Sequence, residues 1–134
     1  MHQRILVVDD EPDMVCLLTY HLRTAGYNVC VAATGREGIA QAQRHLPDLI
    51  LLDVMLPDLD GYSACEFLHK VPATASIPVL ILTAVSGEFQ RCQAFGSGAV
   101  GFLNKPFRVS HLLHCVQTTL AQAQADQFDG DPPV

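Results

Sequence analysis

Short apolar runs along the chain each stop at a polar or charged residue. The clearest runs occupy 5–8, 49–52 and 79–82, and a fourth lies at 101–103. Continuous apolar runs of this length, bounded by chain breakers, favour strands that are buried on both faces of a parallel sheet. A less uniformly apolar segment at 27–33 predicts a further strand at an edge of the sheet. The pattern therefore predicts five strands.

Segments with helical spacing alternate with these strands. Pro12 opens a first helix that ends near Gly26, because proline suits the first turn and glycine a C-terminal stop. Further helices are expected at about 36–45, after 57–61, at about 86–95 and at about 109–125. The residues expected to face inward in the first and third helices are Met14, Leu17, Leu18, Leu22, Ala25, Ala64, Phe67 and Leu68.

Five alternating strand–helix units predict an α/β fold with a doubly wound parallel sheet, because crossovers between parallel strands are right-handed. The flavodoxin-like strand order 2-1-3-4-5 would place the ends of the first, third and fourth strands side by side. Asp9 and Asp10 follow the first strand, Asp53 ends the third, Thr83 ends the fourth and Lys105 follows the fifth. We therefore expect these side chains to meet at one edge of the sheet.

The residue types at this edge indicate a metal and phosphoryl site. Clustered carboxylates repel one another unless a hard divalent cation neutralises them, and oxygen ligands favour Mg²⁺ or Mn²⁺. Lysine supplies a point charge suited to phosphate, and a threonine hydroxyl supplies a donor. An aspartate held in such a place can act as a nucleophile. A purely structural ion-pair network would avoid three acids facing one lysine.

The composition is that of a globular protein. The chain has 134 residues, of which 49% are hydrophobic and 16% charged, and its formal net charge is −6. The sequence contains no Lys/Arg cluster, so direct contact with nucleic acid is not expected. Its apolar stretches are too short to predict a membrane span or a signal peptide. The five cysteines are widely spaced and include no C-x-x-C motif, which indicates reduced thiols in a cytoplasmic protein.

Four motifs in order give the chain a resemblance to the receiver domains of two-component response regulators, of the chemotaxis-regulator kind. They are VVDDEP at 7–12, LDVMLPDLDG at 52–61, LTA at 82–84 and GAVGFLNKPF at 98–107. The resemblance implies that Asp53 is the phosphoacceptor, Thr83 the switch hydroxyl and Lys105 the phosphate-contacting cation. It also implies a Mg²⁺ or Mn²⁺ site formed by Asp9, Asp10, Asp53 and the backbone carbonyl of Met55.

The same resemblance implies several finer features. The Lys105–Pro106 peptide is expected to be cis. Phe102 stands where the family more often has tyrosine, so the two rotamers of this switch residue would differ by packing alone. Met55 and Val85 would flank the path of the attacking water, and neither side chain holds water well. Slow self-dephosphorylation is therefore expected, and Met55→Asn with Val85→Glu should shorten the phosphoryl lifetime by about tenfold or more.

The implied function is that of a signalling phosphoacceptor, which catalyses only its own phosphorylation and dephosphorylation. Its partners would be a sensor histidine kinase or phosphotransfer protein and a downstream effector domain or protein, and it could dimerise on phosphorylation. A phosphohydrolase of the haloacid dehalogenase kind is disfavoured, because the second acid of that group would fall on Met55. A degenerate receiver that only binds partners remains the alternative, although such domains usually lack one of the key residues.

Two local motifs resemble metal-binding sequences but are better explained by ordinary structural roles. Asp58-Leu59-Asp60-Gly61 resembles part of a calcium-binding EF-hand loop, but that loop's first and twelfth positions would be Leu56 and Phe67. His111 and Cys115 lie four residues apart, which is a weak zinc signal without further ligands. The receiver-like domain is expected to span residues 1–125. Residues 126–134 are acidic and rich in proline, which predicts a tail or the start of a linker.

Overall fold

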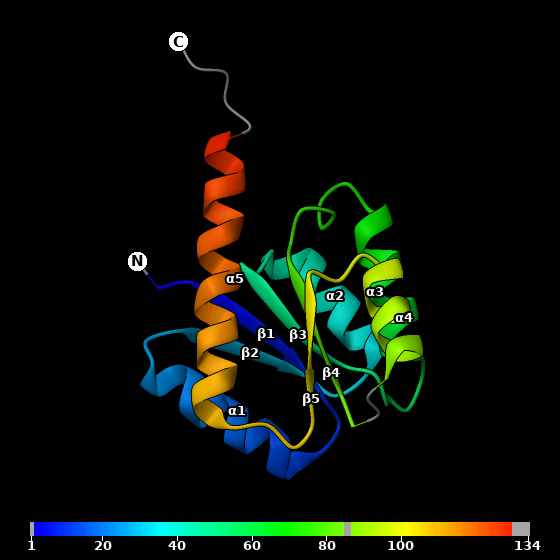
Figure 1. The fold of residues 1–134 in the computed structure, drawn as a ribbon, viewed down its shortest axis with the longest axis horizontal. Coiled ribbons are helices and arrows are strands. Elements are labelled where there is room, and N and C mark those ends of the chain that lie inside the picture. Colours follow the sequence, from blue (N-terminus) through cyan, green and yellow to red (C-terminus); the bar gives the residue numbers. More distant parts are fainter. Residues whose placement is uncertain (1, 85–86, 130–134) are drawn as a thin grey trace.

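The computed structural model describes residues 2–84 and 87–129. Five parallel strands form one sheet in the order β2-β1-β3-β4-β5, which confirms the predicted fold (Figure 1). The strands are β1 Arg4–Val8, β2 Asn28–Ala32, β3 Leu49–Asp53, β4 Val79–Thr83 and β5 Gly101–Asn104. The less apolar β2 lies at an edge, as its sequence predicts, and β1, β3 and β4 are adjacent in the middle of the sheet.

Helices cover both faces of this sheet (Figure 1). They are α1 Pro12–Thr24, α2 Gly35–His45, α3 Gly61–Lys70, α4 Glu88–Gly96 and α5 Val109–Asp129. Helices α1 and α5 pack on one face, and α2, α3 and α4 pack on the other. Helix α5 continues to Asp129, four residues beyond the predicted end near Ala125. Residues 130–134 lie outside the described residues, so the division of the chain at residue 126 stays a prediction.

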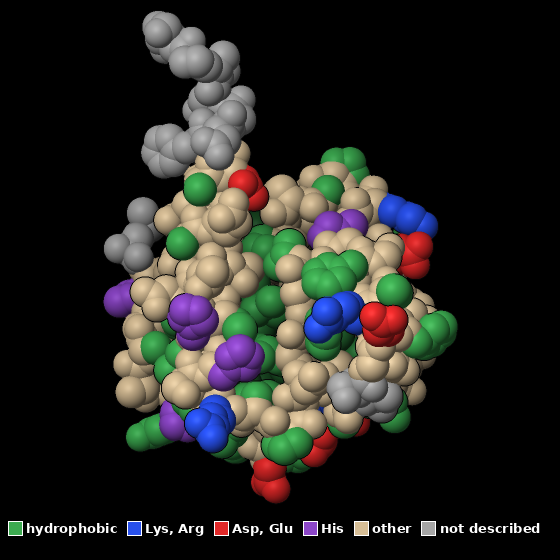
Figure 2. Space-filling model, viewed as in Figure 1, with side chains coloured by type: hydrophobic (Ala, Val, Ile, Leu, Met, Phe, Trp, Pro, Cys, Tyr) green, Lys and Arg blue, Asp and Glu red, His purple; other side chains and the backbone are tan. Residues whose placement is uncertain are grey.

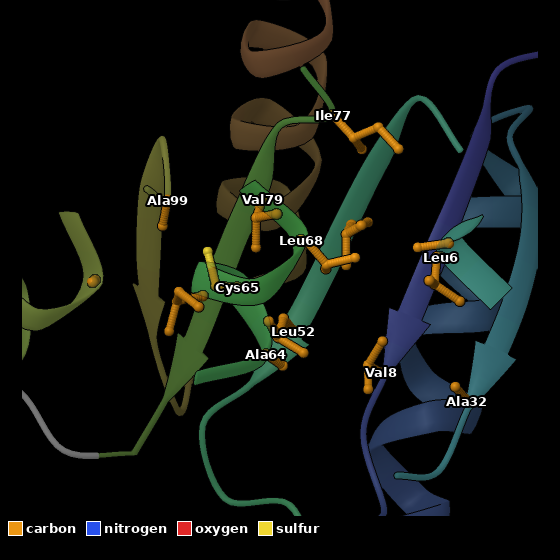
Figure 3. Close-up of a cluster of buried hydrophobic side chains, with 14 residues drawn as sticks. Leu6, Val8, Ala32, Leu52, Ala64, Cys65, Leu68, Ile77, Val79 and Ala99 are labelled. Carbon is orange, nitrogen blue, oxygen red and sulfur yellow. The ribbon is translucent and has the colours of Figure 1, made fainter. Parts of the chain in front are cut away.

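The two faces of the sheet form two separate apolar clusters. Leu6, Val8, Ile50 and Leu52 point towards α2, α3 and α4, and Figure 3 shows this cluster. Residues at the alternate positions 5, 7, 49 and 51 point towards α1 and α5. Successive strand residues face opposite sides, so a strand buried on both faces must be apolar throughout. Burial of each such side chain contributes roughly 1.5–3 kcal/mol to folding.

Three of the side chains expected to face inward, those of Leu17, Ala25 and Phe67, are exposed. Leu17 is 39% and Phe67 is 48% exposed. The buried line of α3 runs through Gly61, Cys65 and Leu68, and Phe67 lies about 100° around the helix from Leu68. In α1 the buried residues are Leu18 and Leu22, which places Leu17 at the edge of the buried face. The apolar stripes are therefore narrower than the sequence indicates.

A groove lies beside α5 at the amino edge of the sheet, where hydrophobic side chains line its floor (Figure 2). It encloses about 940 Å³, and its walls include Pro47 and Pro78, which directly precede β3 and β4. The predicted acidic site is at the carboxyl ends of the same strands, so the groove belongs to the opposite edge. Within the described part of the chain, no helix is both long and apolar enough to cross a membrane.

Candidate functional site

The predicted site residues meet at the carboxyl edge of the sheet. Asp9 directly follows β1, Asp53 is the last residue of β3 and Thr83 is the last residue of β4. The strands are in register here, because Val8 pairs with Leu52 and Asp53 with Leu82. Parallel strands in register end together, so the residues that close them become neighbours.

Three carboxylates form a compact cluster at this point. One oxygen from each of Asp9, Asp10 and Asp53 can be chosen so that all lie within 4.8 Å of one another. Asp9 is fully buried and Asp53 is 3% exposed, whereas Asp10 faces solvent. The Asp9 carboxylate also accepts a hydrogen bond of 3.0 Å from the Glu11 backbone N–H. The cluster therefore has two buried members and one at its mouth.

Lys105 lies against the two buried carboxylates. Its Nζ is 3.1 Å from Asp9 Oδ2 and 3.4 Å from Asp53 Oδ1. The backbone N–H of Lys105 donates to the Thr83 carbonyl at 2.7 Å, which anchors the start of this segment beside β4. The Lys105–Pro106 peptide bond is cis, as expected. The acids, the lysine and Thr83 are thus all brought to one place.

Burial and the neighbouring charges shift the pKa values of Asp53 and Lys105. Burial raises the pKa of Asp53 above its ordinary value; the Lys105 ammonium opposes this rise and the Asp9 carboxylate adds to it. Burial alone would lower the pKa of Lys105, but attraction to Asp53 and Asp9 outweighs burial and raises it. Lys105 consequently keeps its charge at neutral pH, and it is the cation that partly compensates the buried acids.

The residues present fit a small divalent cation. Mg²⁺ binds oxygen ligands at about 2.1 Å in an octahedron, so opposite ligands are separated by about 4.2 Å. The three carboxylate oxygens, which lie within 4.8 Å of one another, are therefore spaced nearly as ligands around one such ion would be. Hard oxygen ligands also match Mg²⁺ or Mn²⁺ better than softer metals.

The loop after β3 packs tightly against the end of that strand. Gly61, the first residue of α3, donates its N–H to the Val54 carbonyl at 2.9 Å. A Cβ at Gly61 would collide with the Asp53 carbonyl oxygen and would lie 2.8 Å from Val54 Cα. Met55 donates its N–H to Asp53 Oδ1 at 3.4 Å, and its side chain is 71% exposed. The metal-binding role of its carbonyl stays a prediction, and Val85 lies outside the described residues.

The predicted switch residues lie on β4 and β5. Thr83 is 3% exposed, and Phe102 is half-buried beside α4. The Phe102 ring meets Phe95 edge-on with centroids 6.1 Å apart, and the Arg91 guanidinium lies 5.4 Å from its centroid. Packing is therefore not the only influence on the Phe102 rotamer, because a cation–π contact of this kind contributes about 0.5–1 kcal/mol when exposed.

Sequence reasoning missed some neighbours of the site. Glu11 places Oε1 3.9 Å from Lys105 Nζ. Asp58, whose sequence motif resembles only part of a calcium loop, accepts backbone hydrogen bonds from the start of α2. The sequence Thr34-Gly35-Arg36-Glu37 has the form of a helix capping box, which could have indicated that α2 begins at this point.

The sequence matches the family model of the response regulator receiver domain over residues 5–117. It is 44% identical over 117 residues to the DNA-binding dual master transcriptional regulator RpaA of Synechocystis, covering 87% of this chain and 48% of that protein. It is 36% identical to protein PilH of Pseudomonas aeruginosa, covering 88% of this chain and 98% of PilH. The chain therefore spans about half the length of RpaA and nearly all of PilH.

Solved structures agree with the sequence matches. The chemotaxis protein CheY4 of Vibrio cholerae superposes with a TM-score of 0.85 at 31% identity, covering 89% of this chain and 99% of that one. A sensor histidine kinase of Pseudomonas aeruginosa has a receiver domain with a TM-score of 0.84 at 32% identity, covering 90% of this chain and 99% of that one. In that domain a magnesium ion is coordinated in the active site cleft. This chain belongs to the family of response regulator receiver domains.

Proposed function

We propose that this receiver domain accepts a phosphoryl group on Asp53 from a histidine kinase or phosphotransfer protein. The observation that carries the proposal is the convergence of Asp53, two further carboxylates and Lys105 at one sheet edge, with Lys105 Nζ 3.4 Å from Asp53 Oδ1. Asp9, Asp10, Asp53 and the Met55 carbonyl would hold Mg²⁺ or Mn²⁺. The bound ion would supply positive charge that screens the acids from the incoming phosphate.

The chemistry proposed for Asp53 is an in-line transfer. A carboxylate oxygen forms a bond to phosphorus while the phosphorus–nitrogen bond of phosphohistidine breaks and the imidazole leaves. Lys105, already beside Asp53, would contact the phosphoryl oxygens, since an ammonium suits phosphate as a point charge. Such transfer depends mainly on positioning and electrostatic stabilisation, which are what these buried side chains provide.

The consequence of phosphorylation would be a change of shape. A phosphoryl group carries about −1.5 to −2 charges at neutral pH and three strong acceptor oxygens. These would draw Thr83 and Lys105 towards Asp53, and the space left by Thr83 would let Phe102 turn inward. The altered surface would then control a downstream effector domain or protein in the cytoplasm. The domain would act as a signalling phosphoacceptor rather than as an enzyme on other substrates.

The central test compares two aspartates at opposite ends of β3. Asp53→Asn removes the nucleophile at the carboxyl end, and Asp48→Asn is the matched control just before the amino end, where Asp48 accepts a bond of 2.8 Å from Arg4 N–H. With acetyl phosphate and Mg²⁺, mass spectrometry should show one added phosphate on the wild type and on Asp48→Asn, and none on Asp53→Asn. Labelling of Asp53→Asn at the wild-type level would refute the assignment.

The metal part of the proposal has a separate test. Asp10→Ala removes the exposed acid at the mouth of the cluster and should abolish labelling at Mg²⁺ concentrations that saturate the wild type. Normal labelling of Asp10→Ala would place the metal elsewhere. Failure of the wild type itself to label with any phosphodonor would instead favour a receiver that only binds partners.

A further inference from the structure

The start of α2 has an unusually complete set of hydrogen-bond partners. Thr34 Oγ1 accepts from the Glu37 N–H at 3.0 Å, and the Thr34 carbonyl accepts from Gly38 at 2.9 Å. The Glu37 carboxylate in turn accepts from the Ala33 N–H at 3.2 Å. The Thr34 bond is that of a capping box, whereas Glu37 binds the residue before the N-cap, and both leave the amides of Gly35 and Arg36 to find partners elsewhere.

A carboxylate from another loop binds both remaining amides. Asp58 Oδ1 accepts from the Gly35 N–H at 2.7 Å, and Oδ2 accepts from the Arg36 N–H at 2.9 Å. The same Oδ1 also accepts from the Leu59 N–H at 2.9 Å. The bond from Arg36, followed by those from Gly35 and Leu59, holds the pKa of Asp58 below its ordinary value. An anion at a helix N-terminus is also favoured by the helix dipole.

Asp58 belongs to the loop that connects Asp53 to α3, so this contact fixes that loop from outside. Leu59 packs over Gly35, where an added Cβ would lie 2.6 Å from Leu59 Cδ1. At its far end the loop is held by Gly61 against Val54. Met55 lies between these two attachments. Met55 is also held locally, because the Leu56 N–H donates to the Val54 carbonyl at 3.2 Å, so the Asp58 contact acts on the position of the loop as a whole.

We propose that Asp58 is a positioning residue for the metal site. Its two-oxygen bond to the start of α2 sets the conformation of residues 54–60 and thereby aims the Met55 carbonyl at the acidic cluster. The inference rests on the proposed function, since it concerns how well that site binds Mg²⁺. Residues that orient metal ligands from behind commonly change affinity by about ten- to a hundredfold when removed.

The experiment separates positioning from ordinary helix capping. Asp58→Ala is compared with Thr34→Ala, which removes the Thr34 side-chain bond at the same helix start without touching the loop. Both variants should lower the melting temperature. Calorimetric titration should show that Asp58→Ala raises the Kd for Mg²⁺ by about tenfold, whereas Thr34→Ala leaves the Kd near the wild-type value. Equal Kd values for the two variants would overturn the proposal.

A second pair of variants controls for the loss of charge. Asp58→Asn and Asp60→Asn each remove one negative charge from the loop. Asp60 caps α3 through the Ser63 N–H at 2.9 Å, and asparagine is an equally good cap. Asp58→Asn loses one of its two acceptor oxygens and should weaken Mg²⁺ binding more than Asp60→Asn does. The same weakening in both would mean that charge alone matters and would overturn the positioning role.

The outcomes also separate this inference from the proposed function. Wild-type protein that binds no Mg²⁺ and takes no phosphate would contradict the function itself. Wild-type protein that binds and labels normally, together with an unchanged Kd in Asp58→Ala, would contradict only the role of Asp58.

Discussion

Helices α2 and α4 both begin at the carboxyl edge of the sheet, but their first turns are held very differently. Backbone N–H groups in the first turn of α2 donate hydrogen bonds to the side chains of Thr34 and Asp58. Helix α4 begins after Gly87, whose φ is +145°, and no side-chain cap is found there among the described residues. The loop after β3 is thus attached to a helix start that carries several side-chain hydrogen bonds, whereas the described residues provide no side-chain cap for α4.

A glycine at the start of α3 and a glycine at the far end of α4 also differ in how closely they are packed. An added Cβ at Gly61 would meet the backbone of Asp53 and Val54, but at Gly96, the last residue of α4, it would meet no atom within 4 Å. Phe89 in the first turn of α4 is 69% exposed. The connection between β3 and α3 is therefore closely packed, whereas α4 is open at Phe89 and at Gly96. Under the proposed function, rigidity suits ion binding and looseness suits a switch.

The largest expected effect on stability comes from adding a methyl group at Gly61, where the surrounding backbone is closely packed. Gly61→Ala should lower the free energy of unfolding by about 3 kcal/mol, because overpacking against backbone forces β3 and α3 apart. Gly96→Ala, on the open side, should change it by no more than about 0.5 kcal/mol. Urea denaturation of both variants measures the difference. Similar losses at the two glycines would show that the contrast in packing is not real.

A smaller effect is expected on local unfolding of the first turns of α2 and α4. A side-chain cap contributes about 1 kcal/mol, which corresponds to about a fivefold difference in the opening equilibrium. Backbone amides in the first turn of α4 should therefore exchange with deuterium about five times faster than those of α2. Mass spectrometry of protein with and without acetyl phosphate should also place the larger change at α4. Greater protection at α4 than at α2 would reverse the comparison.

The smallest expected effect is the pH dependence of the unfolding free energy that comes from Asp58. The pKa of Asp58 is lowered in the folded protein, so its contribution to stability is complete above its ordinary value of 3.8 and is lost as the pH falls through the lowered value. The difference in unfolding free energy between wild type and Asp58→Asn should therefore shrink between about pH 5 and about pH 3. Urea titrations at several pH values measure it. A constant difference across this range would mean that ionisation of Asp58 does not support the α2 contact.

The sequence was sufficient for the parts of the molecule that depend on burial and strand order. The apolar runs located the strands, and the polar residues that end them located the site, since adjacent parallel strands must end together. Helix faces were less predictable: Leu17 and Phe67 are apolar but lie at the edge of narrow buried stripes. An apolar stripe shows which residues can be buried, and the width of the contact depends on the neighbouring elements.

The contacts of Asp58 and Arg91 could not have been predicted from local pattern. Asp58 bonds to residues more than twenty positions earlier in the chain, and Arg91 lies over a ring on another element. Both are exposed charged residues, which in most proteins contact only solvent. Their partners become known only once the crossover connections place α2 beside the β3 loop and α4 beside β5.

Lys105 gives the acidic cluster a cation of its own, because its ammonium lies beside Asp9 and Asp53. Three carboxylates and one ammonium leave two uncompensated negative charges, which a single divalent ion would neutralise. An arriving ion would compete with Lys105 for Asp9 and Asp53, and the displaced ammonium would remain at the mouth of the same pocket. Under the proposed function, one side chain would thus compensate the acids before metal binds and would then become available to the incoming phosphoryl group.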